Sequence, residues 1–263
     1  MVFFAISCSI LVSDKIIVFV FALLCSTKMN CGCLNFLSWA KKYNFAQPIT
    51  KHPVPLFYQQ YINETTSLAV WQITETEDFF LAAVPLSREI THPHKRLQHL
   101  AGRYLLQHLF PAFPIHLIQI ASTRKPYLEG DSHHFSISHC GDFVAAIVST
   151  TNRVGIDIEM PVEKIGRIVH KFLKPSEQQL LENLPLPNVL QSLTIAWSAK
   201  EAMFKWYGLG KVDFKEHMHL DHIIYGDQSG TIEAAFLKDE SIPLQLSYHF
   251  FDGLVLSWLH TGG

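Results

Sequence analysis

The sequence predicts an α+β fold in two similar halves that divide near Thr151. Two stretches have the apolar spacing of long helices, at about 93–110 and 190–207, and a run of strand-like segments follows each. Helices and strands segregated in this way are typical of helices packed on antiparallel sheets. The predicted domains are residues 48–150 and 151–263, preceded by an apolar leader and linker at residues 1–47.

The first half contains the first long helix. Pro93 suits its first turn, and Pro111 ends it. Arg96 and Arg103 are seven residues apart and therefore lie on nearly the same face of this helix. They form either a solvated basic stripe or a phosphate site. Lys125 and Pro126 form a turn. The strands expected in this half lie at 68–73, 115–121, 134–139 and 143–149.

The second half opens with a strand whose two faces differ. Apolar residues at 154, 156 and 158 alternate with Gly155, Asp157 and Glu159, so both carboxylates share the other, exposed face. In the helix that Gly208 ends, Trp197, Glu201 and Lys205 recur at steps of four and share one face. Further strands are expected at 217–224, 231–237, 244–251 and 254–260.

Three acids converge if this strand and this helix pack together. Asp157, Glu159 and Glu201 would then offer hard oxygen ligands with water positions left over, which suits Mg²⁺. The adjacent Lys205 suits a phosphate. The alternative is an ordinary polar surface, on which Glu201 and Lys205 form a helical pair worth about 0.2–0.5 kcal/mol.

Composition limits the class of protein. Hydrophobic residues make up 48% of the chain and the net charge is −2, which indicates a packed protein and gives no support for nucleic-acid binding. Four of the five cysteines precede residue 34, so a disulfide framework is not expected and a reducing, cytoplasmic location fits. Cys31 and Cys33 have no second cysteine pair that would complete a zinc site.

The leader, residues 1–27, is strongly apolar but is interrupted by Asp14 and Lys15. It is either a membrane anchor or secretion signal, or a non-native extension ahead of a protein that starts near Met29. Neither apolar run reaches the about 18 residues of a membrane span, and no positive charge precedes the first run. The second interpretation is therefore favoured, and no membrane association is expected.

Four motifs occur in an order that resembles the Sfp-type 4′-phosphopantetheinyl transferases. They are Lys125-Pro126, Ser138-His139, the strand from Gly155 to Glu159, and the helical segment from Trp197 to Lys205. The resemblance extends over about 68–251. Two residues depart from the family pattern: Arg124 stands where a small residue is usual, and Cys140 where a serine is frequent. Neither is expected to touch a group that the chemistry needs.

The resemblance implies two pseudo-twofold-related subdomains, each an antiparallel sheet with a long helix, and an active site in the cleft between them. It implies a monomeric holo-[acyl-carrier-protein] synthase that uses coenzyme A and Mg²⁺. Its partner would be a carrier protein of fatty-acid, polyketide or nonribosomal-peptide synthesis, and its by-product adenosine 3′,5′-bisphosphate.

The resemblance also implies roles for individual residues. Asp157, Glu159 and Glu201 would bind Mg²⁺, and Glu201 and Lys205 would act in catalysis, with Glu201 or a metal-bound water as the base. The side chains that would hold coenzyme A are Arg103, Lys125, Ser138, His139 and Lys205, with Arg96 as a weaker candidate. Lys200 is not expected to touch metal or substrate.

Two other functions fit the same sequence. A Mg²⁺-dependent nucleotide or pyrophosphate hydrolase would use the same three acids without a protein acceptor. The other is a membrane-anchored binding module without catalytic activity, in which residues 1–27 would be a genuine membrane anchor.

Overall fold

A computed structural model describes residues 6–12, 15–21, 56–86, 88–184, 188–226 and 228–262. The chain separates into two compact units, Met1–Pro53 and Val54–Gly263. The first unit is described only as an antiparallel pair of strands, β1 (Ile6–Val12) and β2 (Lys15–Phe21). The predictions about a start near Met29 and about Cys31 and Cys33 lie outside the described residues. None of the helices in the described ranges has both the length and the apolar character needed to span a membrane.

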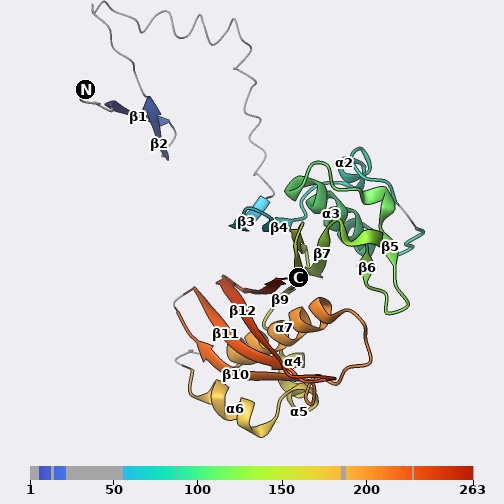
Figure 1. The fold of residues 1–263 in the computed structure, drawn as a ribbon. Helices are drawn as coiled ribbons and strands as arrows, with labels where there is room; N and C mark the ends of the chain where they lie inside the picture. The colour runs from blue at the N-terminus through green and yellow to red at the C-terminus, as the bar shows by residue number, and fades with distance from the viewer. Residues whose placement is uncertain are drawn as a thin grey trace, which may run out of the picture. The chain divides into compact units, whose positions relative to one another are not determined.

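The second unit begins with a four-stranded antiparallel sheet in the order β3-β4-β8-β7. The helix α3 (Pro93–Leu109) packs on this sheet, and the short helix α2 (Glu77–Leu81) packs on α3 (Figure 1). The strands are β3 (Leu56–Asn63), β4 (Thr66–Gln72), β7 (His134–Cys140) and β8 (Phe143–Ser149).

The rest of the unit is a five-stranded antiparallel sheet in the order β10-β11-β12-β13-β9. The helix α7 (Val189–Tyr207) packs along β9 and β13 at one edge of this sheet (Figure 1). The strands are β9 (Asn152–Glu159), β10 (Met218–Ile224), β11 (Ser229–Phe236), β12 (Ile242–Phe251) and β13 (Leu254–Gly262). The short helices between β9 and α7 are α4 (Glu163–Arg167), α5 (Val169–Phe172) and α6 (Pro175–Glu182).

The two sheets pack face to face, so the layers run helix, sheet, sheet, helix. In β4, Ala69 and Trp71 belong to the core under α3, whereas Leu68 and Val70 belong to the core between the sheets. Both faces of this strand are therefore buried, which explains its unbroken apolar run. Apolar residues of β9 line the same inter-sheet core, so the other face of β9 is turned toward α7.

Most elements expected from the sequence are present, and the α+β class with antiparallel sheets is confirmed. The strand expected at 115–121 is wrong: a 3₁₀ turn (Ile115–Leu117) precedes the two-residue strand β5 (Gln119–Ile120), which pairs with β6 (Pro126–Tyr127). Apolar residues at 115, 117 and 118 suggested a longer strand there, but the chain leaves α3 through Pro111 and Pro114 and has only a short partner. The pseudo-twofold relation and the domain boundary near Thr151 stay predictions.

Candidate functional site

The site is built where β9 approaches α7 at Gly155. A Cβ atom at this position would lie 2.1 Å from the carbonyl oxygen of Ala202 and 2.8 Å from the backbone nitrogen of Trp206. Only glycine allows strand and helix backbones to come this close. The contact places the polar face of β9, with Asp157 and Glu159, directly against the helix that carries Glu201 and Lys205.

Asp157 is buried, with 2% of its surface exposed, which corrects the prediction of an exposed strand acid. The reason is that α7 covers this face of β9. Lys205 Nζ lies 2.6 Å from Asp157 Oδ1 and 2.7 Å from Ser138 Oγ, and Ser138 donates a 2.8 Å hydrogen bond to the same Oδ1. The second oxygen, Oδ2, is also buried and has no partner among the described residues. It is therefore available to a ligand that the chain itself does not supply.

Alternate residues of β7 face the acids of β9. Ser138 bonds to Asp157, and Cys140 Sγ donates a 3.5 Å hydrogen bond to Glu159 Oε2. The expectation that Cys140 touches no group of the site is therefore wrong, because a residue two positions from Ser138 shares its face. His139 points the other way and is exposed. The structure shows no hydrogen bond between Ser138 and His139 in this described strand, as expected for neighbours on a strand.

The carboxyls of Glu159 and Glu201 both have raised pKa values. Burial is the larger cause for Glu159, and the charge of Asp157 is the next. Burial, followed by the charge of Asp157, raises the pKa of Glu201 to about 7. Trp197 Nε1 donates a 3.4 Å hydrogen bond to Glu159, whereas Glu201 has no hydrogen-bond partner within the described ranges. The three acids thus lie close enough to repel one another in a poorly solvated place.

These carboxyls suit a divalent cation, although they do not already form a ligand cluster. Across the described ranges, no three His, Cys, Asp or Glu side chains are gathered closely enough to hold a metal ion as they stand. Lys205 draws Asp157 Oδ1 toward Ser138, and Trp197 and Cys140 hold Glu159. A cation would give the buried Asp157 Oδ2 a partner and would reduce the mutual repulsion of the acids. The Mg²⁺ site formed by these three acids stays a prediction.

A group of two arginines and two histidines lies beside the acids. Arg103 is buried, its Nη1 lies 3.0 Å from His99 Nδ1, and burial lowers the pKa of its guanidinium to about 10. Burial, then the charge of Arg103, lowers the pKa of His99 to about 4. Arg88 and His139 also act electrostatically on His99. Within the described ranges, Arg103 has no carboxylate partner, so an anion would stabilise it.

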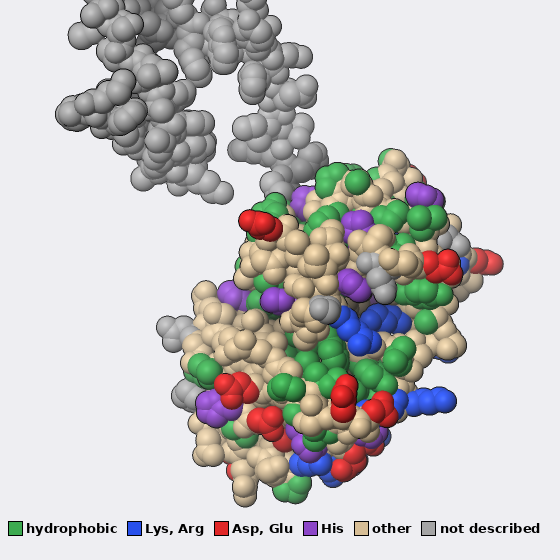
Figure 2. Space-filling view, viewed as in Figure 1, with side chains coloured by type: hydrophobic (Ala, Val, Ile, Leu, Met, Phe, Trp, Pro, Cys, Tyr) green, Lys and Arg blue, Asp and Glu red, His purple; other side chains and the backbone are tan. Residues whose placement is uncertain are grey.

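Sequence reasoning identified Arg103 and His139 but missed Arg88 and His99. The spacing of four between His99 and Arg103 on one helix was the available signal. Arg96 does not join this group: its side chain pairs with Glu77 at 2.7 Å and donates to the carbonyl of Ile90. Figure 2 shows Lys and Arg side chains gathered near the middle of one face, beside hydrophobic side chains.

Lys125 reaches the carboxyl end of α7. Its Nζ donates to the carbonyl oxygens of Lys205, at 2.6 Å, and Trp206, at 3.5 Å. Burial, followed by the charge of Arg153, lowers the pKa of Lys125 to about 8. Gly208 ends α7 with φ 75°, and a Cβ atom there would lie 2.5 Å from the Lys125 side chain. The lysine of the Lys-Pro turn therefore stabilises the helix that carries Glu201 and Lys205.

A cavity of ≈ 210 Å³ adjoins this lysine. Its wall combines the Lys-Pro turn with Lys205 and with apolar side chains of β7 and α7, including Phe135, Ile137 and Phe204. Arg124, in the same wall, has φ 68°, a left-handed conformation that favours glycine.

The raised pKa of Glu201 predicts a pH dependence of stability in metal-free protein. Between about pH 4.5 and 7, Glu201 is ionised in the unfolded chain but still protonated in the folded chain. Unfolding then releases a proton, so the free energy of unfolding falls as pH rises through this window and levels off above it. Glu201→Gln removes this cost, and its melting temperature at pH 8 with EDTA is expected to exceed that of the parent.

The measurement is the melting temperature of parent and variant from pH 4.5 to 8. Glu233→Gln, at an exposed position of β11, is the matched control and is expected to follow the parent. Equal pH profiles for the parent and Glu201→Gln would contradict the burial of this carboxyl.

Comparison with known proteins identifies related chains over the second half. Residues 153–256 match the family model described as the 4′-phosphopantetheinyl transferase superfamily. Enterobactin synthase component D of Salmonella typhi is 32% identical over 113 residues, which are 42% of this chain and 47% of that protein. The protein of the same name from Escherichia coli K12 is 32% identical over 114 residues, which are 42% of this chain and 54% of that protein.

The 4′-phosphopantetheinyl transferase HetI of Nostoc sp. is 30% identical over 84 residues, which are 31% of this chain and 35% of that protein. The chain thus spans about half the length of the two enterobactin synthase components, and about a third of HetI. The matched segment contains Asp157, Glu159, Glu201 and Lys205.

Proposed function

We propose that the protein transfers the 4′-phosphopantetheine arm of coenzyme A to a serine of a carrier protein, because residues 153–256 match the family model of the 4′-phosphopantetheinyl transferase superfamily. The serine oxygen forms a bond to the β-phosphorus of the pyrophosphate. The bond between this phosphorus and the bridging oxygen breaks, and adenosine 3′,5′-bisphosphate leaves with that oxygen. The serine proton passes to a base.

One observation supports this proposal most directly: the buried Asp157, with an unpartnered oxygen, stands beside Glu159, Glu201 and Lys205. We propose that Asp157, Glu159 and Glu201 would hold Mg²⁺. When bound, the ion would neutralise negative charge on the pyrophosphate. Without a cation, the negative charges of the three acids would repel the pyrophosphate.

The side chains around the acids supply the remaining functions. Lys205 already lies between Asp157 and Ser138, and its ammonium would stabilise a phosphate oxygen. Glu201 is the proposed base, acting directly or through a bound water. In metal-free protein its pKa of about 7 makes it half protonated at neutral pH, and a bound cation would lower that pKa. Positioning and charge neutralisation then contribute most to the rate.

The group formed by the positive Arg88 and Arg103 and the imidazoles of His99 and His139 is the proposed site of the nucleotide phosphates. Arg103 is pre-ordered by its contact with His99 and has no carboxylate competitor in the described part of the chain. The neighbouring cavity, with Lys125, Pro126 and Phe204 in its wall, is the proposed place for the flat adenine base. Arg96 is left out of this proposal because Glu77 already holds it.

The test is transfer to a carrier protein. The full chain is mixed with coenzyme A, Mg²⁺ and an apo carrier protein, and the intact mass of the carrier is measured. A gain of one phosphopantetheine arm supports the proposal, with loss of the gain in EDTA as the control. Release of the nucleotide without any change in carrier mass would show a hydrolase, and absence of both reactions would refute the proposed chemistry.

Lys125→Ala is expected to have two separable effects. It removes a charged donor from the last carbonyls of α7, so the free energy of unfolding should fall by about 1–2 kcal/mol. It also removes binding shared by substrate and transition state, so the KM for coenzyme A should rise more than kcat falls. Urea unfolding and steady-state kinetics measure these effects. Lys164→Ala, on the exposed surface of α4, is the control, and an unchanged KM with lowered kcat would contradict this role.

A further inference from the structure

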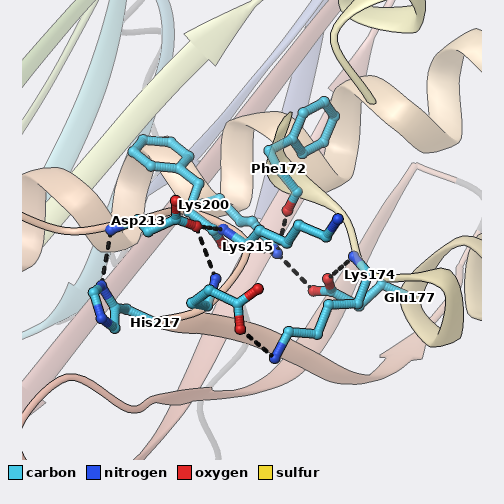
Figure 3. Close-up of polar contacts among 9 residues, drawn as sticks. Phe172, Lys174, Glu177, Lys200, Asp213, Lys215 and His217 are labelled. Carbon is cyan, nitrogen blue, oxygen red and sulfur yellow. Dashed lines mark hydrogen bonds and ion pairs between the residues drawn. The ribbon is translucent and has the colours of Figure 1, made fainter. Parts of the chain in front are cut away.

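Lys200 is fully buried, and every one of its ammonium donors has a partner. Its Nζ lies 2.7 Å from Glu177 Oε1, 2.5 Å from the carbonyl oxygen of Phe172 and 3.1 Å from that of Phe214 (Figure 3). Glu177 in turn accepts hydrogen bonds from the backbone nitrogens of Lys174 and Leu220. The pair thus ties α7 to the junction of α5 and α6, to the loop before β10, and to β10 itself.

The two carbonyls that Lys200 holds belong to the residues whose rings enclose Trp197. The Phe172 ring lies edge-on to Trp197 with centroids 5.1 Å apart, and the Phe214 ring stacks on it at 5.6 Å. Trp197 is one helical turn before Lys200, so both side chains leave the same side of α7. The ammonium of Lys200 therefore holds the backbone of both residues, Phe172 and Phe214, whose rings contact this indole.

The indole of Trp197 reaches the site. Its Nε1 donates to Glu159 Oε1, and the other partner of this carboxylate in the described chain is the Cys140 thiol, at 3.5 Å. A thiol is a weak donor, so the indole is the stronger constraint on the orientation of Glu159. The contacts run without a break from Glu177 and Lys200 through Phe172 and Phe214 to Trp197 and Glu159.

We propose that Lys200 and Glu177 are a positioning pair: by holding Phe172 and Phe214 around Trp197, they fix the orientation in which Glu159 meets its ligand. The identification of this ligand as Mg²⁺ rests on the proposed function. The alternative is a pair that only stabilises the fold. Replacing both members of a buried pair often restores stability that a single replacement loses, so stability and positioning can be separated.

The first test needs no metal and no activity. The indole N–H signals are recorded in ¹H–¹⁵N spectra of the metal-free chain, and Trp197→Phe assigns the signal of Trp197. Glu159→Gln is expected to move that signal, because it changes the acceptor. Lys200→Met should move it too, and leave the Trp206 signal in place, since Trp206 lies on the same helix but donates to Thr261.

Lys174→Met is the matched control. Lys174 lies in the same region and pairs with Glu216 at 3.2 Å, but its side chain contacts neither carbonyl (Figure 3). It is expected to move neither indole signal. An unmoved Trp197 signal in folded Lys200→Met would overturn the proposal, and so would equal movement of the Trp197 and Trp206 signals, which indicates general loosening of α7.

The second test separates positioning from stability. Lys200→Met/Glu177→Gln removes both charges and is expected to be more stable than Lys200→Met, which leaves Glu177 buried and unpaired. It still lacks the donors to Phe172 and Phe214, so the Mg²⁺ concentration for half-maximal transfer should rise about 10-fold or more in this variant. The KM for coenzyme A at saturating Mg²⁺ should change far less. If Lys200→Met does not fold, the double variant is used in both tests.

Recovery of the parent's Mg²⁺ requirement together with stability in the double variant would overturn the positioning role. If the parent chain transfers nothing to any carrier, the proposed function fails, but the indole signals still decide whether Lys200 controls the contact between Trp197 and Glu159.

Discussion

The proposed transfer of phosphopantetheine is expected to fall by more than about a hundredfold when Asp157 is replaced by asparagine. Outer partners of a metal ligand typically contribute 10–100-fold, and Asp157 is proposed as a ligand itself. Asparagine keeps the volume of the buried side chain, but it removes the charge that pairs with Lys205 and that would bind a cation. The neutral side chain also lacks the second anionic oxygen offered by Oδ2.

This variant has a measurable cost in stability, because Asp157 is buried. Loss of the charged contacts with Lys205 and Ser138 is expected to lower the free energy of unfolding by about 1–3 kcal/mol, moderated by the partial exposure of Lys205. Initial rates of carrier labelling and urea unfolding are measured together. Asp221→Asn, at an exposed position of β10, is the control. Transfer within threefold of the parent in folded Asp157→Asn would remove Asp157 from the site.

Gly155→Ala is expected to destabilise the protein by about 3 kcal/mol or more, the largest stability effect among these variants. The added methyl would overlap the carbonyl oxygen of Ala202 and the backbone nitrogen of Trp206, and backbone atoms inside a helix cannot rotate away as a side chain can. Strand and helix must then separate, which also moves Glu201 and Lys205 away from Asp157. Transfer should therefore be lost even in the fraction that remains folded.

The control is the same substitution at an open position. A methyl group added at Gly166, in α4, would have no neighbouring atom within 4 Å, and this glycine does not have a left-handed φ. Gly166→Ala is expected to leave the unfolding free energy unchanged or to raise it by up to about 1 kcal/mol. Denaturant midpoints of the two variants measure the difference. Equal midpoints would show that β9 and α7 do not need the close approach.

Local patterns were sufficient to predict much of the fold. The period of two in β9 and the period of four in α7 are strong signals, and Gly208 ends α7 as expected. The strand expected at 115–121 was wrong because an apolar segment forms a strand only where a partner strand lies beside it, and here only Gln119 and Ile120 have one. Pairing partners are not encoded in the segment itself.

The candidate site was predicted less completely. Asp157, Glu159, Glu201 and Lys205 were identified because their spacing alone places them on two faces that can meet. His99, Arg88 and the contact of Cys140 with Glu159 were missed, and Arg96 was proposed for the site although it pairs with Glu77. These outcomes depend on which elements become neighbours, so no pattern within one element reveals them.

The sequence by itself determined which residues share a face of β9 and of α7, because the periods of strand and helix are properties of the backbone. Only the tertiary structure decided that α7 covers the face of β9 with Asp157, that Lys125 lies at the end of α7, and that Lys200 is buried against Glu177. The physical reason is that burial and charge pairing depend on atoms brought together from distant parts of the chain, and these contacts shift the pKa values and orient the carboxyls.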